Sequence, residues 1–291
     1  MIKKMILAVL ALGIFATSCS SDDDNGPSTA TITLNLNGLE ELGSDFVYEG
    51  WIIVNGSPVS TGTFSSVTFP QSFTVNADEL ASASTFVLSI EPSNDTDPAP
   101  AATKILAGDF SGNSASVDSN GIVGDFSSST GKYILATPTD GGADTNEESG
   151  VWFLDNSSGM PMVGLDLPTL TDGWKYEGWA VIVGTPVSTG TFTSISDFDD
   201  NASTTPFKGD SGDGPAFPGE DFLQNAPSGL TFPTDLKGTT IVISVEPSPD
   251  NSASPFTLKP LAHMVPVNAM NHTVIDMGTG PVTMLNGTVT R

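Results

Sequence analysis

The sequence predicts an all-β protein built from two tandem β-sandwich modules that arose by internal duplication. The chain holds 21 prolines and 30 glycines in 291 residues, and no segment keeps the apolar i, i+3, i+4, i+7 period of an amphipathic helix over three turns. Short β-branched and aromatic runs alternate with Gly, Pro, Asn, Asp and Ser, which is typical of a sandwich or barrel. A 17-residue segment also occurs twice, and its second copy indicates a second copy of the folding unit.

The first 19 residues predict a secretory signal peptide that ends at a lipidated cysteine. Lys3 and Lys4 precede an apolar run of about ten residues, which fits a signal peptide and is too short for a stable membrane span. Cys19 is the only cysteine and ends the sequence FATSC, which resembles the lipobox of bacterial lipoproteins. The resemblance implies acylation of Cys19, and two acyl chains suffice for stable anchoring. Ordinary cleavage that leaves a free thiol is the alternative.

Residues 20–30, SSDDDNGPSTA, predict a flexible acidic tether, because they offer little apolar surface to bury. An acidic cluster directly after a lipidated cysteine resembles the export signal that sends some Gram-negative lipoproteins to the outer face of the outer membrane. The resemblance implies an outer-membrane lipoprotein that faces the cell exterior. Attachment on the periplasmic face is the alternative.

The charge of the chain excludes some partners and leaves others open. The formal net charge is −25, a field that repels phosphate backbones and anionic lipid surfaces. We therefore expect no nucleic-acid partner and contact with the membrane only through the lipid anchor. An unidentified protein or glycan partner fits the composition, and so does calcium. High acidity also keeps an exposed protein soluble, which is the simpler explanation.

The internal repeat defines the expected domains. YEGWIIVNGSPVSTGTF at 48–64 and YEGWAVIVGTPVSTGTF at 176–192 agree at 12 of 17 positions with an offset of 128 residues. Further along, the Glu-Pro pair at 91–92 matches that at 246–247 with an offset of 155 residues. The difference of 27 residues indicates an insertion, which we place in the Asp/Gly/Pro-rich segment near 194–229. We expect a first module over 31–126 and a second over 127–291.

The residue types of the repeat favour a structural role over a catalytic one. Turn chemistry follows each first strand, and a mid-strand glycine, Gly62 or Gly190, suggests a bulge or a close approach by a tryptophan ring. Each glutamate of a Glu-Pro pair is expected to hold the following loop by accepting backbone hydrogen bonds. A ligand-stacking face is the alternative. The residues of this repeat signature are Tyr48, Glu49, Trp51, Glu91, Pro92, Tyr176, Glu177, Trp179, Glu246 and Pro247.

The same motifs resemble the extracytoplasmic C-terminal domain of anti-sigma-K factors. That family shows an LPPL-type strand, a Tyr-x-x-Trp strand, a Gly-x-Pro-Val turn, a Gly-x-Phe strand and a V-x-x-EP strand, and both modules carry most of these features. The resemblance implies a β-sandwich fold with a sensing or interaction role. In the family a sigma-binding segment and a membrane helix precede this domain, whereas here we expect a signal peptide and Cys19 in their place. Sequestration of a sigma factor is therefore not expected.

Enzyme chemistry finds little support in the sequence. GDSGDGP at 209–215 is similar to the nucleophile loop of chymotrypsin-like proteases, but His263 and His272 both lie downstream of Ser211 and lack the family context. A glycosidase needs two carboxylates about 5 to 9.5 Å apart in one cleft, which one sequence does not show. We expect a protein without enzymatic activity and without a cofactor, with calcium left open.

Acidic residues of the insertion are the candidates for a calcium site. DFDDN begins like an EF-hand loop, but Ala202 stands in place of the turn glycine and Lys208 in place of the bidentate glutamate. A looser extracellular site needs only a few oxygen ligands. The candidate ligands are Asp197, Asp199, Asn201, Asp210, Asp213, Glu220 and Asp221.

Three functional hypotheses follow. The first is a non-enzymatic, lipid-anchored envelope lipoprotein that acts as a binding or scaffold module at the cell surface. The second is an envelope-sensing accessory of an anti-sigma-type regulatory system, which contacts a separate membrane regulator. The third is a carbohydrate-binding or hydrolytic component, which requires an open cleft with convergent acids and exposed tryptophans.

Overall fold

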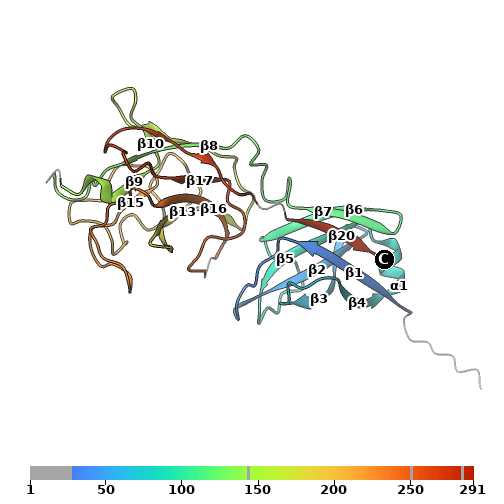
Figure 1. Ribbon diagram of the computed structural model, residues 1–291. Coiled ribbons are helices and arrows are strands. Elements are labelled where there is room, and N and C mark those ends of the chain that lie inside the picture. The colour runs from blue at the N-terminus through green and yellow to red at the C-terminus, as the bar shows by residue number, and fades with distance from the viewer. Residues whose placement is uncertain (1–27, 143–144, 250–251, 283–284) are drawn as a thin grey trace, which may run out of the picture.

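A computed structural model describes residues 28–142, 145–249, 252–282 and 285–291. Nearly all regular structure in these residues is antiparallel β-sheet, as the sequence predicts. Two modules lie side by side, with strands β1 to β7 in one and β8 to β19 in the other (Figure 1). The expected leader, Cys19 and most of the tether lie outside the described residues.

The first module is one eight-stranded sheet that folds around its core. Its two edge strands follow one another in the chain, and Phe64 of one edge packs on Phe73 of the other with ring centroids 5.7 Å apart. The arrangement is therefore sandwich-like, with the sheet nearly closing on itself. In sheet order the strands are β3 (Ser57–Phe64), β2 (Phe46–Val54), β5 (Thr85–Pro92), β6 (Lys104–Ser111), β7 (Ser114–Asp118), β20 (Asn286–Thr290), β1 (Thr29–Asn37) and β4 (Gln71–Asn76).

The second module repeats the central strands of the first in a separate sheet. That sheet has the order β14 (Thr185–Phe192), β13 (Trp174–Ile182), β16 (Thr240–Pro247), β17 (Leu261–Met264) and β19 (Gly278–Thr279). Another sheet has the order β12 (Leu165–Asp166), β8 (Thr130–Leu135), β9 (Gly150–Trp152) and β15 (Gly219–Asp221), with β18 (Ile275–Asp276) also paired to β8. The hairpin β10 (Leu154–Asp155) and β11 (Met162–Val163) and the 3-10 turn η1 (Glu147–Ser149) complete this module.

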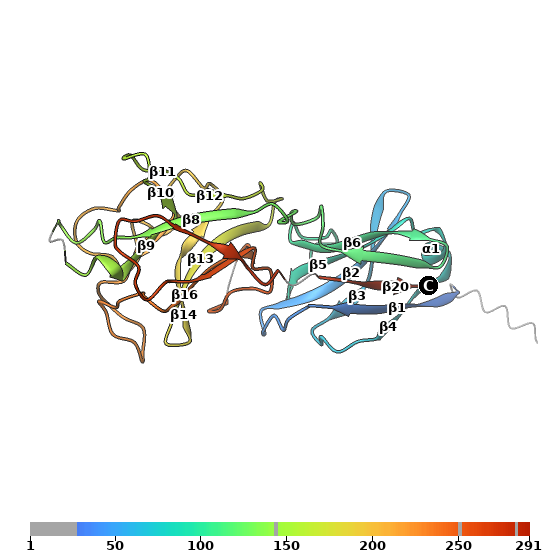
Figure 2. The same ribbon diagram turned by 45° about the horizontal axis from the view of Figure 1, so that its top comes forward.

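The last strand corrects the expected division of the chain. The expected second module spans 127–291, but β20 pairs with β1 and β7 inside the first sheet. Figure 2 shows β20 running through the first module, away from the second, to the C-terminus. The pairing has a physical reason, because β20 supplies hydrogen bonds to two strands that would otherwise end the sheet. The second module is thus inserted between two strands of the first.

The start of the first module also differs from expectation. Strand β1 begins at Thr29, inside the segment expected to be tether, because Ala30 and Thr31 already pair with β4. The sequence reading missed one helix, α1 (Ala77–Ser82). Asn76 caps it, since its side chain accepts hydrogen bonds from the backbone of the first turn at 2.9 and 3.1 Å.

Each repeated hairpin carries the predicted bulge. The register shifts between Gly50 and Trp51 in one copy and between Gly178 and Trp179 in the other. The prediction that a tryptophan ring lies against Gly62 or Gly190 is wrong. Aromatic rings lie instead over the facing glycines, where an added Cβ would come within 3.1 Å of the Phe86 ring or 2.7 Å of the Phe153 ring. The hydroxyl oxygens of Thr61 and Thr189 are nearer still, so these oxygens and the rings together leave no room for a side chain.

One large apolar cluster runs through both modules, and a smaller one, with Trp152 and Leu154, lies in the second module. The large cluster includes Ile32 and Leu88 of the first module and Phe192 and Ile243 of the second. At the junction, Gly173 approaches the first module so closely that an added Cβ would lie 2.6 Å from the carbonyl carbon of Ala102. The two modules are therefore packed against one another, and their junction has a defined shape.

Candidate functional site: the pocket between the modules

The repeated tyrosines fix the loop that leads into each YEGW strand. The Tyr48 hydroxyl donates to the carbonyl of Glu40 at 2.8 Å, and the Tyr176 hydroxyl donates to the carbonyl of Pro168 at 2.6 Å. Both hydrogen bonds span eight residues, and both rings are fully buried. Burial raises the pKa of each tyrosine well above its usual value. Each of these hydrogen bonds holds the loop before a YEGW strand against its module.

The repeated tryptophans are buried and hydrogen-bonded. Trp51 is 2% exposed and Trp179 is 1% exposed. Their indole N–H groups donate to Ser89 Oγ at 2.8 Å and Ser244 Oγ at 2.7 Å. Buried rings cannot stack on a glycan. The tryptophans therefore have a structural role, and the alternative of a ligand-stacking face with exposed tryptophans is wrong.

Each Glu-Pro glutamate continues the same chain of hydrogen bonds. Ser89 Oγ donates to Glu91 Oε1, which also accepts from the backbone N–H of Ala101 at 2.8 Å. In the second module Ser244 Oγ donates to Glu246 Oε1, which accepts from the N–H of Phe256 at 2.8 Å. The sequence predicted such loop-holding contacts, and the structure contains them in both copies. Burial raises the pKa of Glu91, while the hydrogen bonds from Ser89 and Ala101 oppose the shift.

The remaining signature glutamates pair across their hairpins. Ser60 Oγ donates to Glu49 Oε1, and Ser188 Oγ donates to Glu177 Oε1. The serine oxygens in turn accept the backbone N–H groups of Gly62 at 3.1 Å and Gly190 at 2.9 Å. These contacts stabilise the bulges. Glu49 and Glu91 lie close enough for the charge of Glu49 to contribute to the raised pKa of Glu91.

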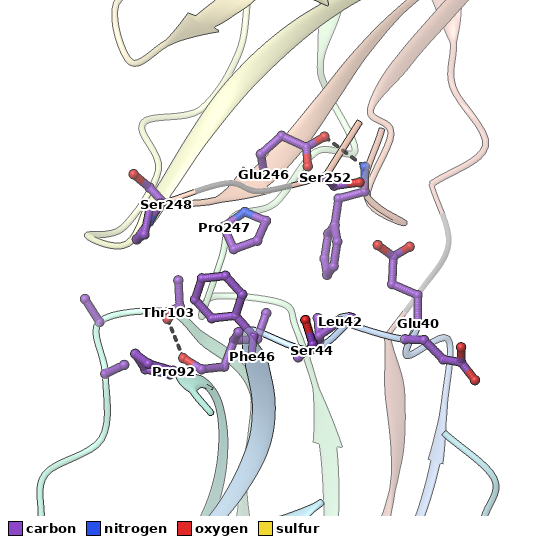
Figure 3. A pocket seen from close by; sticks show the side chains of 17 residues that line it. Glu40, Leu42, Ser44, Phe46, Pro92, Thr103, Glu246, Pro247, Ser248 and Ser252 are labelled. Atoms are coloured by element: carbon purple, nitrogen blue, oxygen red, sulfur yellow. Dashed lines mark hydrogen bonds between the residues drawn. The ribbon is translucent and has the colours of Figure 1, made fainter. Parts of the chain in front are cut away.

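A pocket of about 480 Å³ opens where the two modules meet. Figure 3 shows Phe46 at the start of β2 pointing toward Pro247 at the end of β16. The first module adds the loop with Glu40 and Leu42. The second adds, among others, Phe256. Pro92 and Pro247 occupy corresponding places in the repeat, and both line the pocket.

Contacts across the junction hold these walls in place. Trp174 at the start of β13 donates its indole N–H to the carbonyl of Lys104 at 3.2 Å and packs on Phe256 with ring centroids 5.9 Å apart. The hydroxyl of Thr171 donates to the carbonyl of Ile122 at 2.7 Å. A ligand would therefore meet a preformed cavity, which lowers the entropic cost of binding.

The structure does not gather the seven calcium candidates into one site. Asp213 pairs with Lys208, Asp197 Oδ1 accepts the N–H of Phe198, and Asp210 lies 3.3 Å from the amide of Gln224. Across the described ranges, no three or more His, Cys, Asp or Glu side chains are placed to hold a metal ion. Asp197, Asp210 and Asp213 are thus held by separate loop contacts, away from a common site.

Three of these acids are instead buried inside the second module. Asp221 Oδ2 accepts the backbone N–H of Thr139 at 2.9 Å, and its Oδ1 accepts the indole N–H of Trp152 at 2.8 Å. Glu220 accepts from the hydroxyl of Thr205, and Asp199 Oδ2 accepts the N–H of Gly219 at 3.1 Å. The seventh candidate, Asn201, lies against Gly190 beside Asp199.

Burial shifts the pKa values of the three acids strongly. It raises the pKa of Glu220 to about 8, and it raises the pKa of Asp199 and of Asp221 to about 6. Hydrogen bonds to each carboxylate oppose the shift, and the neighbouring carboxylates add to it. The insertion therefore supplies a buried acidic cluster whose charge state depends on pH near neutrality.

The protease-like residues occupy separate structural roles. His263 Nδ1 lies 3.0 Å from the hydroxyl of Tyr133, and His272 Nε2 lies 3.4 Å from Glu147 Oε2. Ser211 donates its backbone N–H to the carbonyl of Thr139 at 3.0 Å. The loop similarity thus reflects a turn that these backbone contacts fix.

Sequence reasoning found the Glu-Pro loops but not the pocket between them. The repeat places Pro92 and Pro247 at equivalent strand ends, and this equivalence is the only sequence signal that pointed to the pocket. Phe46, Leu42 and Phe256 carry no motif, so only the packing of the modules shows that they face a common cavity. Within the part of the chain that the structure describes, no helix is long and apolar enough to cross a membrane.

Comparison with known proteins agrees with the motifs of the first module. Residues 16–105 match the family model described as Anti-sigma-K factor rskA, C-terminal. No curated protein and no solved structure matched the chain. The second module lies outside the matched residues, and its tyrosine, tryptophan and Glu-Pro contacts repeat those of the first. The segment 16–105 is therefore similar to the C-terminal domain of anti-sigma-K factors, and the first module is an anti-sigma-K-like domain.

Proposed function

We propose that this chain is a non-enzymatic, extracytoplasmic accessory of an anti-sigma-type regulatory system, which contacts a separate membrane regulator. The observation that carries the proposal is the match of residues 16–105 to the anti-sigma-K C-terminal family. The duplicated hydrogen-bond networks support the non-enzymatic part of the proposal, because the repeated serines and glutamates in them hold loops in place. A rigid pair of modules with a shaped junction suits recognition of a partner or ligand.

The test joins a genetic and a chemical measurement in the native host. Deleting the gene is expected to change the transcript levels of a regulon controlled by one extracytoplasmic sigma factor, and the intact gene is expected to restore them. Cross-linking in cells is expected to join the chain to a membrane protein that carries a sigma-binding segment. Unchanged transcripts together with no such cross-linked regulator would contradict the proposal.

A second candidate function is a lipid-anchored binding or scaffold protein on the outer membrane, facing the cell exterior. Cys19 favours it, since this single cysteine ends an apolar leader in the sequence. Metabolic labelling with a fatty acid is expected to mark the wild-type chain and not the Cys19→Ser variant. Digestion of intact cells with protease is expected to remove the body of the protein. Protection of a labelled chain would place it on the periplasmic face instead.

A further inference from the structure

The pocket between the modules has the size of a small-molecule site, and hydrogen bonds fix its walls. Its volume of about 480 Å³ lies within the range of roughly 300 to 1,000 Å³ that is usual for ligand pockets. Both of its Glu-Pro walls are fixed by buried carboxylates, through Ala101 in the first module and Phe256 in the second. The cavity therefore exists before any ligand arrives.

The lining of the pocket combines apolar rings with negative charge. Phe46, Leu42 and Pro247 offer apolar surface, and the acidic residues Glu40 and Glu41 lie in the wall of the first module. Glu246 also lines the pocket, but its side chain is buried and its Oε1 accepts from Ser244 and Phe256. Its described lining includes no lysine, arginine or histidine. An aromatic face and a nearby carboxylate both attract a cation, and they repel an anion.

Two lysines lie just behind the walls, and their ammonium groups are already engaged. Lys104 Nζ donates to the carbonyl of Ala101 at 3.0 Å, and Lys259 Nζ donates to the carbonyl of Phe256. Burial lowers the pKa of Lys259, while the charges of Glu40 and Glu246 oppose that shift. Lys259 therefore lies close enough to Glu40 and Glu246 to offset part of their negative charge, although neither lysine lines the pocket.

We propose that the junction pocket binds a small organic cation, a positively charged amine attached to an aromatic or alkyl body. The body would lie between Phe46 and Pro247, and the ammonium group would lie toward Glu40 and Glu41. Binding at this place is independent of which regulator the chain contacts, since it needs only the two modules and their junction.

Three probes of similar shape and different charge test the inference on the chain from residue 20 to residue 291. They are 2-phenylethylamine, 2-phenylethanol and phenylacetate, and calorimetry with NMR titration measures their binding. The amine is expected to bind saturably and about tenfold more tightly than the alcohol. Phenylacetate is expected to bind more weakly than either. Equal binding of all three, preference for the anion, or no saturable binding of the amine would overturn the inference.

Two variants test whether the amine binds in the pocket. The double change Glu40→Gln with Glu41→Gln is expected to weaken amine binding by about tenfold. The double change Asp78→Asn with Glu79→Gln, which removes two charges on α1, is expected to leave it unaltered. Ser44→Trp adds a ring at an exposed position of the lining and is expected to abolish binding. Retention of full affinity in Ser44→Trp, with the fold intact by circular dichroism, would place the amine elsewhere and overturn the inference.

Discussion

The indole nitrogen of Trp51 donates a hydrogen bond to the hydroxyl of Ser89, 2.8 Å away and 38 residues further along the chain. The second module repeats this relationship between Trp179 and Ser244 at 2.7 Å. In each copy the serine passes the contact on to the glutamate of a Glu-Pro pair. The duplication has thus kept a polar network as well as an apolar pattern.

Ser89→Ala is expected to destabilise the first module by about 1 to 3 kcal/mol, because it leaves the buried indole N–H without an acceptor. Urea unfolding followed by circular dichroism would measure the change. Ser93→Ala, at an exposed position after β5, is the matched control and is expected to change stability little. A Ser89→Ala protein as stable as this control would show that the hydrogen bond contributes nothing.

Glu91→Ala and Glu246→Ala test the loop-holding role separately in each module. Removing Glu246 is expected to speed hydrogen exchange at the amide of Phe256, since that amide donates to Glu246 Oε1. Removing Glu91 is expected to do the same at Ala101. Each variant serves as the control for the other, and exchange that rises equally at both amides would contradict local anchoring.

Removing residues 286–291 is expected to unfold the first module selectively. Strands β1 and β7 would each lose the partner that joins them. The sheet would then be split into two parts, which is much less stable than the continuous eight-stranded sheet. Arg291 would be lost with them, and its guanidinium donates to the carbonyls of Leu80 and Ala83 at 2.7 and 2.8 Å. Hydrogen exchange would report loss of protection in β1 with protection kept in β13. Unchanged protection of β1 would refute the pairing.

The second module is expected to lose stability as the pH rises from about 5 to 8. Glu220 has a folded-state pKa of about 8, above its ordinary value of 4.5. Its protonated form therefore favours the folded state below pH 4.5, and this contribution disappears as the pH passes through the folded pKa. We expect a loss of about 1 to 3 kcal/mol across this range, because relaxation and partial hydration reduce the full effect.

Tryptophan fluorescence during urea unfolding measures this pH effect, since three of the four tryptophans, Trp152, Trp174 and Trp179, lie in the second module. Glu220→Gln is expected to reduce the pH dependence and to leave the part near pH 6 that Asp199 and Asp221 contribute. Glu79→Gln, in the first module, is expected to leave it in place. Stability that rises between pH 5 and pH 8 in the wild-type protein would contradict burial of an ionisable Glu220.

Adding millimolar calcium to the chain from residue 20 onward tests the remaining cation hypothesis. The dispersed positions of Asp197, Asp210 and Asp213 predict no more than a small change in the midpoint of thermal unfolding. Magnesium at equal ionic strength is the control. A rise of the midpoint with calcium alone, lost in Asp199→Asn, would contradict this expectation.

The sequence by itself determined the all-β class, the duplication and the role of the Glu-Pro loops. These features are local: side-chain alternation, turn residues and spacing act within a strand and its neighbours along the chain. Trp51 and Glu91 could be assigned structural roles because their residue types and repeat positions already indicated a buried strand and an anchored loop.

Only the tertiary structure decided where β20 pairs, which side chains face the junction, and which acids of the insertion are buried. Nothing in the residues 286–290 states that their partners are β1 and β7, because strand pairing between distant segments depends on the register and edges of the whole sheet. Phe46 and Phe256 likewise meet only because two separate modules pack together. Contacts over long sequence distances follow from packing of the complete chain, and a local pattern does not specify them.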